Sequence, residues 1–192
     1  MSGALPTTPV LRDINISSTH PTLVSVSRSL HRQVRSKGVQ RWSINGSYAP
    51  NSREDLMPIW AFALSQKGQY ETFTFVPPVY GTTSGTASGS CAVDAAAVAG
   101  DTSVTCTLSS GTLKAGDFVK FTGHDKVYAL TADFTGTGSL AIFPSLIAAV
   151  ADTETVAFTD VPFTVAFTTD MQKFSRGAID LHDFDITLAE VV

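Results

Sequence analysis

The residues best able to do chemistry are histidines and cysteines, and their spacing matches no known catalytic or metal-binding motif. The chain has four histidines and two cysteines: His20, His31, His124, His182, Cys91 and Cys106. The histidines form no HExxH, HxH or Cys/His pattern with the spacing that metal ligands need. The two cysteines belong to no Cys-x-x-Cys pair, so we expect reduced, half-buried thiols and no zinc site.

A small acidic cluster surrounds His182 near the end of the chain. Asp180, Asp183 and Asp185 could in principle hold a hard cation through their carboxylates. The glycine and the terminal glutamate that an EF-hand loop requires are both missing. We therefore expect a solvated acidic turn that leads into the last strand.

The sequence also contains no motif for nucleophilic catalysis or for phosphate binding. The chain contains no Gly-x-Ser-x-Gly elbow, and the residues next to Cys91 include no base that would activate its thiol. Gly81, Gly85 and Gly89 recur every fourth position, but neither a lysine nor a helix start follows them as in a phosphate-binding loop. We expect a protein that is not an enzyme and needs no metal and no cofactor. An enzyme whose site is assembled from distant residues is the alternative.

A basic cluster is the main charged feature of the sequence. It consists of Arg28, His31, Arg32, Arg35, Lys37 and Arg41. One interpretation is a surface that contacts nucleic acid. Against it, no aromatic residues lie at matching positions to stack on bases, and the chain carries a net charge of −4. We favour a basic rim that docks on an acidic neighbour in an assembly, with Arg28, Arg32, Arg35 and Arg41 as candidate interface residues.

Charge is sparse and unevenly distributed. Only 16% of the residues are charged, against about 25% in a typical domain. Residues 1–80 hold eight Lys/Arg and four Asp/Glu, whereas residues 81–192 hold five and thirteen. This asymmetry indicates separate modules or complementary faces in an assembly. No apolar run approaches the ~18 residues of a membrane span, and residues 1–10 do not read as a signal peptide.

The residues up to 80 predict two strands, one helix and a further strand. Residues 22–34 and 39–48 alternate between apolar and polar side chains, which indicates an antiparallel hairpin with its turn at residues 36–38. An apolar stripe predicts a helix over about 53–67, with Pro58 in its first turn if Asp55 is the cap. Trp60 and Phe62 lie on neighbouring faces of this helix, so at least one is a candidate for an inter-subunit contact.

A Gly/Ser/Thr stretch divides the chain. Residues 81–90 read GTTSGTASGS, which is typical of a linker or long loop. Residues 91–159 contain short strands between glycine-rich turns, which indicates a small β-sandwich or barrel. Residues 163–168 and 184–191 alternate again and are most simply strands of the first sheet. We expect a mainly β fold with one helix (α+β), in which residues 1–80 plus 160–192 form an antiparallel β-sandwich belt and residues 91–159 form an inserted module.

Two groups of segments carry a resemblance to a known protein family. Residues 41–44 (RWSI), 52–59 (SREDLMPI) and 68–78 (GQYETFTFVPP) resemble tail proteins of tailed bacteriophages, above all distal tail (Dit-type) and related minor tail proteins. Residues 113–121 (LKAGDFVKF), 126–128 (KVY) and 142–146 (IFPSL) resemble the β-module often inserted in those proteins. The resemblance covers most of the chain through patterns of structure rather than chemical signatures.

The resemblance implies a structural virion protein. It implies a homo-oligomeric ring, hexameric in that family, that links the tail tube to the tip or baseplate around the channel for DNA. The inserted module would project outward toward side fibres, receptor-binding proteins or host-surface glycans. The protein would be made in the host cytoplasm, would carry no catalytic residues, and would meet DNA only as passing cargo.

Two further interpretations come from other functional classes. The inserted module could be a carbohydrate-binding module with Tyr128, Phe121 and Phe134 as an aromatic platform. The chain could instead bind nucleic acid through the basic residues between Arg28 and Arg41. Glycan binding by residues 91–160 would favour the first, and salt-sensitive DNA affinity would favour the second.

Overall fold

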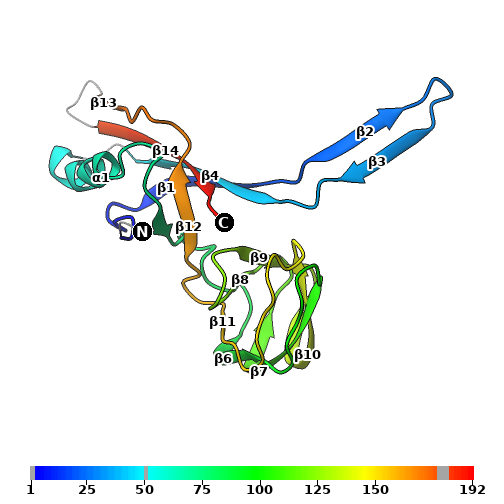
Figure 1. Ribbon diagram of the computed structural model, residues 1–192. Coiled ribbons are helices and arrows are strands. Elements are labelled where there is room, and N and C mark those ends of the chain that lie inside the picture. The colour runs from blue at the N-terminus through cyan, green and yellow to red at the C-terminus, as the bar shows by residue number, and fades with distance from the viewer. Residues whose placement is uncertain (1–2, 50–51, 177–181) are drawn as a thin grey trace.

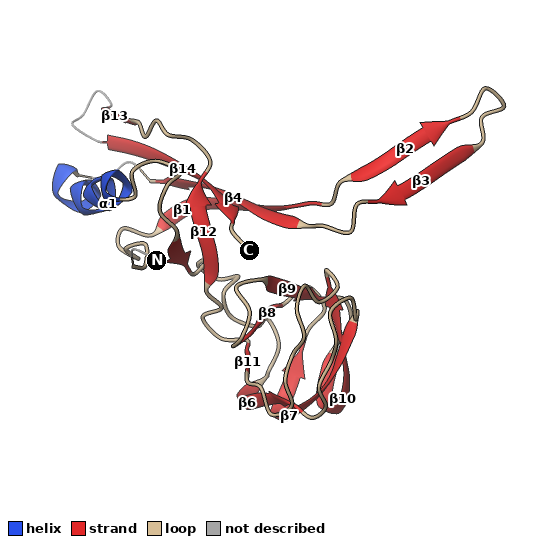
Figure 2. Ribbon diagram, in the orientation of Figure 1, coloured by secondary structure: helices blue, strands red, loops and turns tan. Residues whose placement is uncertain are grey.

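The computed structural model describes residues 3–49, 52–176 and 182–192, and it confirms a mainly β, antiparallel fold with one helix (Figures 1 and 2). One six-stranded sheet, which we call the belt sheet, has the order β1-β4-β14-β12-β5, with β13 paired to β14. Its strands are β1 (Leu11–Thr19), β4 (Arg41–Tyr48), β5 (Phe73–Phe75), β12 (Phe163–Phe167), β13 (Phe174–Arg176) and β14 (His182–Glu190).

The last strand of the chain lies at the centre of the belt sheet. Ile186 pairs with Gly46 of β4, and Ala189 pairs with both Ser43 of β4 and Ala166 of β12. The strands after residue 160 therefore return to the sheet that the first residues begin. The alternation of apolar residues predicted this strand. Phe184, Ile186 and Leu188 are all buried, while the residues between them are more exposed.

Helix α1 (Arg53–Ser65) packs through Leu56, Ile59 and Ala63 into the core of the belt, which it covers in place of a second sheet. Ser52 is its N-cap, because the Ser52 Oγ accepts a hydrogen bond from the Asp55 backbone N–H at 3.3 Å. The prediction that Pro58 lies in a first turn capped by Asp55 is therefore wrong. Pro58 lies inside the helix, where it removes one backbone donor.

A second six-stranded sheet curls into an almost closed barrel, built only from residues 88–157. Its order is β11-β8-β9-β10-β7-β6. A bridge between Ala92 and Thr155 brings its two ends together. Its strands are β6 (Ser88–Val93), β7 (Ser103–Leu113), β8 (Phe118–Phe121), β9 (Val127–Leu130), β10 (Phe134–Phe143) and β11 (Val156–Ala157).

The Gly/Ser/Thr stretch is not a free linker. The Asp117 carboxylate accepts hydrogen bonds from the Thr83 hydroxyl, from the Ser84 backbone N–H at 2.9 Å and from the Lys114 backbone N–H at 2.8 Å. Burial alone would raise the pKa of Asp117, but these hydrogen bonds outweigh it and hold the pKa below its ordinary value. Asp117, which is distant in sequence, thus fixes the position of a stretch whose composition is typical of a linker.

A long hairpin, which we call the arm (residues 22–39), extends away from both sheets (Figure 1). It contains β2 (Thr22–Val26) and β3 (Arg32–Ser36), which form a separate two-stranded sheet. The prediction of one strand over residues 22–34 is wrong, because the chain turns at residues 27–31. β4 pairs with β14 on one side and with β1 on the other, and sequence reasoning missed β1.

Candidate functional site

The arm exposes apolar side chains along its whole length. Every residue from 22 to 39 is exposed, although the arm is rich in valine. Val24, Val26 and Val34 keep more than half of their surface accessible. Soluble proteins seldom expose apolar groups so close together unless another surface covers them. The arm is therefore the clearest candidate for a contact surface.

The register of the arm sorts its side chains into two faces. Val24 pairs with Val34, and Val26 pairs with Arg32, so these four side chains share one face. Leu23 pairs with Arg35 on the opposite face. The apolar face thus carries one arginine at its outer end, and the other face carries a second.

The structure spreads the basic cluster instead of gathering it. Arg28 lies in the turn at the tip, Arg32 and Arg35 lie on opposite faces of β3, and Arg41 begins β4 at the foot of the arm. All four are exposed. The four side chains therefore form a row along the arm instead of a single compact basic patch.

Trp60 and Phe62 belong to helix α1, which lies far from the arm, beside the other end of the belt (Figure 1). Trp60 packs edge-on against Phe184 with ring centroids 5.8 Å apart, and Phe62 packs in the same way on Phe73 at 5.3 Å. Both are only partly buried. Each side chain therefore contributes to the belt core and keeps part of its surface exposed.

A buried charged contact, which sequence reasoning missed, fixes the barrel on the belt. The Lys126 ammonium donates to a Glu190 carboxylate oxygen and, at 2.5 Å, to the Gln40 side-chain oxygen. The other Glu190 oxygen accepts the Val127 backbone N–H at 2.9 Å. Lys126 and Glu190 are almost fully buried. Burial lowers the pKa of Lys126, and Glu190 only partly offsets this effect.

Aromatic packing extends this junction. The Trp42 indole N–H donates to the Val127 carbonyl at 2.8 Å, and its ring meets Phe118 edge-on at 5.2 Å. Phe118 also packs against Phe163 of the belt at 5.3 Å. Val127 belongs to the belt core rather than to the barrel core. The two sheets therefore share side chains and are held as one unit at this junction.

The proposed aromatic platform for sugars does not exist. Tyr128 and Phe121 are fully buried and Phe134 is nearly so, all within the barrel core. The Tyr128 hydroxyl interacts with His124 Nδ1 at 2.9 Å, and His124 is itself buried in the connection between β8 and β9. These rings hold the barrel together and cannot stack on a ligand.

The described residues hold no cluster of three or more metal-ligating side chains. Asp180 of the acidic cluster lies outside the described residues. Cys91 and Cys106 are free, fully buried and in contact with each other, and the hydrogen bond that the Cys106 thiol donates to Cys91, together with burial, raises the pKa of Cys106. Within the described ranges, no helix has both the length and the apolar character needed to cross a bilayer.

No protein-family model matches the chain, and it has no significant match among curated proteins.

Proposed function

We propose that this chain is a structural subunit of a phage tail, a ring-forming distal tail or minor tail protein. In this proposal it links the tail tube to the tip or baseplate and surrounds the channel for DNA. The observation that carries the proposal is the arm, a separate two-stranded sheet with three exposed valines on one face. The resemblance of residues 41–78 and 113–146 to tail proteins supplies the class of assembly.

The arm needs a partner for energetic reasons. A two-stranded hairpin alone is at best marginally stable in water. Covering one exposed valine contributes roughly 1 kcal/mol, so covering the three together contributes about 3 kcal/mol toward the cost of ordering the hairpin. A hairpin of this kind is best explained as an element that is completed by contact with another molecule.

Charge favours a second copy of this chain as that molecule. The arm and its foot carry the basic cluster, whereas residues 81–192 hold five Lys/Arg against thirteen Asp/Glu. Opposite charge on two regions of one chain suits a heterologous contact, and repeated heterologous contacts close into rings. The barrel would then lie outside the ring, where it could meet other tail proteins in the virion.

Substitution of the arm's apolar face tests the proposal. In sedimentation velocity at high protein concentration, the wild-type chain is expected to form one closed oligomer. The double variant Val24→Ser/Val34→Ser is expected to need at least ten times the wild-type protein concentration to form the same fraction of oligomer. Val98→Ser is the control, because Val98 is a valine on the barrel side of the chain that is even more exposed than Val24 and Val34.

Two outcomes would contradict the proposal. A wild-type chain that stays monomeric at every concentration would contradict the proposed ring. A monomer with salt-sensitive affinity for DNA, lost in Arg32→Ala/Arg35→Ala, would favour the nucleic-acid interpretation instead.

A further inference from the structure

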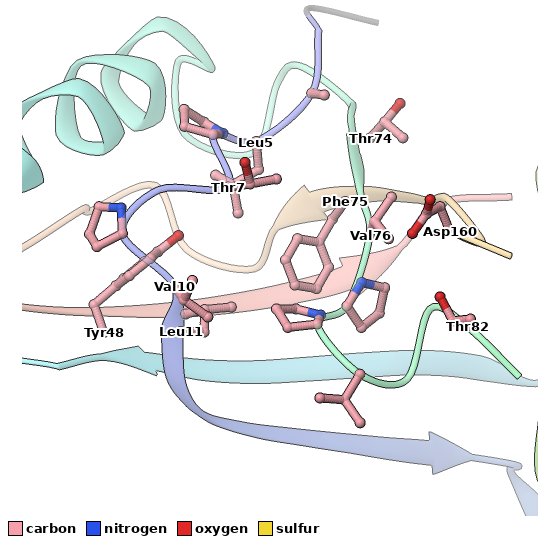
Figure 3. A pocket seen from close by; sticks show the side chains of 16 residues that line it. Leu5, Thr7, Val10, Leu11, Tyr48, Thr74, Phe75, Val76, Thr82 and Asp160 are labelled. Atoms are coloured by element: carbon pink, nitrogen blue, oxygen red, sulfur yellow. The ribbon is translucent and has the colours of Figure 1, made fainter. Parts of the chain in front are cut away.

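An apolar cavity of about 320 Å³ lies at the end of the belt opposite to the arm. The register of the first strand pair fixes this placement, because Leu11 pairs with Tyr48 at the cavity end and Thr19 pairs with Arg41 at the arm end. Figure 3 shows Val10, Leu11 and Tyr48 on one side of the cavity and Asp160 on the other. The arm of a chain therefore points away from the chain's own cavity.

The tip of the arm presents a single apolar side chain. Leu30 is 83% exposed at the turn that joins β2 to β3. The turn is well defined, since the Leu30 backbone N–H donates to the Ser27 carbonyl at 2.9 Å and the Ser27 backbone N–H donates to the His31 carbonyl at 3.0 Å. A fixed turn holds the Leu30 side chain outward.

Backbone strain marks both the tip and the rim of the cavity. Leu30 has φ of +61°, and Val79, which lines the cavity, has φ of +69°. Among the described large hydrophobic residues, these two are the most exposed, at 83% and 87%. A left-handed conformation is costly for leucine and more so for a β-branched valine. Strain and exposure together at two surfaces indicate that both are shaped for a contact that this single chain does not make.

Charge distinguishes this cavity from the other large hollow. Among the residues that line it, Asp160 is the one carboxylate, and no lysine or arginine lines it. Arg28 and Arg32 flank Leu30 two positions away on either side. The hollow at the foot of the arm is lined instead by the exposed Arg41, which would repel a basic tip, and by Lys126, whose charge is compensated by Glu190.

We infer that the arm tip of one copy docks in the cavity of a second copy, with Leu30 inserted beside Val79 and an arginine of the tip paired with Asp160. This inference rests on the proposed function, because it names the surface that receives the arm. The two surfaces lie at opposite ends of the belt, so each copy offers one tip and one cavity. Contacts of this kind run head to tail around a ring.

A mixing experiment tests the docking directly. Leu30→Asp disables the tip and Val79→Asp disables the cavity rim, and both positions are exposed in the single chain. Each variant alone is expected to be monomeric, with its self-association weakened at least tenfold. An equimolar mixture is expected to form dimers and nothing larger, because one intact tip and one intact cavity remain. The control Val98→Asp is expected to assemble like the wild type.

Failure of the docking can be told apart from failure of the proposed function. Suppose that the wild type assembles. If either single variant then assembles equally well, or if the mixture stays monomeric, the docking is contradicted and the proposed ring is not. If the wild type never assembles, both are overturned.

Reversal of charge is a second measurement on the same contact. Asp160→Lys is expected to weaken self-association about two- to fivefold, as for an exposed ion pair. Arg32→Glu in the same chain is expected to restore it, because the pair is then present with its signs exchanged. A double variant that is weaker than both single variants would contradict the pairing.

Discussion

At the scale of single residues, Glu190 is the most informative side chain of the molecule. It follows Phe184, Ile186 and Leu188 at the same two-residue spacing, so it points to the same buried side of β14. There it accepts hydrogen bonds from Lys126 and from the backbone of Val127. A carboxylate in phase with a buried apolar row is the sequence signal of a buried charge that must have a partner.

Glu190→Gln tests the importance of this contact. The substitution leaves the Lys126 ammonium buried without its carboxylate, so the free energy of unfolding is expected to fall by about 3 kcal/mol. Urea denaturation followed by tryptophan fluorescence measures it, since Trp42 lies at the junction. Asp185→Asn on the same strand is the control, because Asp185 is exposed. Equal losses in the two variants would contradict the assigned role.

The candidate interface residues were predictable from sequence only in part. Their types and number showed that the first eighty residues carry a basic cluster. The register that separates Arg32 from Arg35 could not be derived, because it depends on where the hairpin turns. Alternation continues across residues 27–31, so the turn leaves no break in the pattern.

At the scale of elements, glycine determines where the strands can approach each other. Gly111 has φ of +83°, and a Cβ at this position would lie 2.1 Å from the Thr86 carbonyl oxygen. Gly85 meets the Thr112 carbonyl oxygen in the same way, at 2.0 Å. The Gly/Ser/Thr stretch is thus packed closely against β7. The small residues of the stretch allow this close approach. From sequence alone, the same composition predicted a linker.

Gly111→Ala is expected to destabilise the chain by more than its backbone strain alone, which is about 1–3 kcal/mol. Gly136→Ala is the matched control, since Gly136 has φ of +62° and no heavy atom within 4 Å of the added Cβ. The difference between the two variants in thermal unfolding measures the contact with Thr86. Equal melting temperatures would mean that the stretch moves aside without cost.

Other elements were predicted with uneven success for physical reasons. The helix has an apolar stripe and was predicted close to its observed bounds. The cap used to place Pro58 was wrong because Ser52 competes with Asp55 as a cap, and local sequence does not decide between them. Strand β1 was missed because most of its residues are exposed, so it lacks a clear row of buried apolar side chains. Within the described residues it is an edge strand that pairs with β4 alone.

At the scale of the whole molecule, the barrel is both separate and attached. Its strands all come from residues 88–157, and Gly81 and Val161 at its two ends are joined by a 2.7 Å hydrogen bond. Yet Val127 packs in the belt core, and Lys126 bonds to Glu190 of the last strand. The barrel is therefore fixed in one orientation on the belt, whereas the arm extends away from both sheets.

Electron microscopy of the purified full-length chain at high concentration tests the ring most directly. The proposed function predicts closed particles of a single diameter with a central opening and with barrels on the outer rim. Single, unassociated chains in every field at every concentration would contradict it.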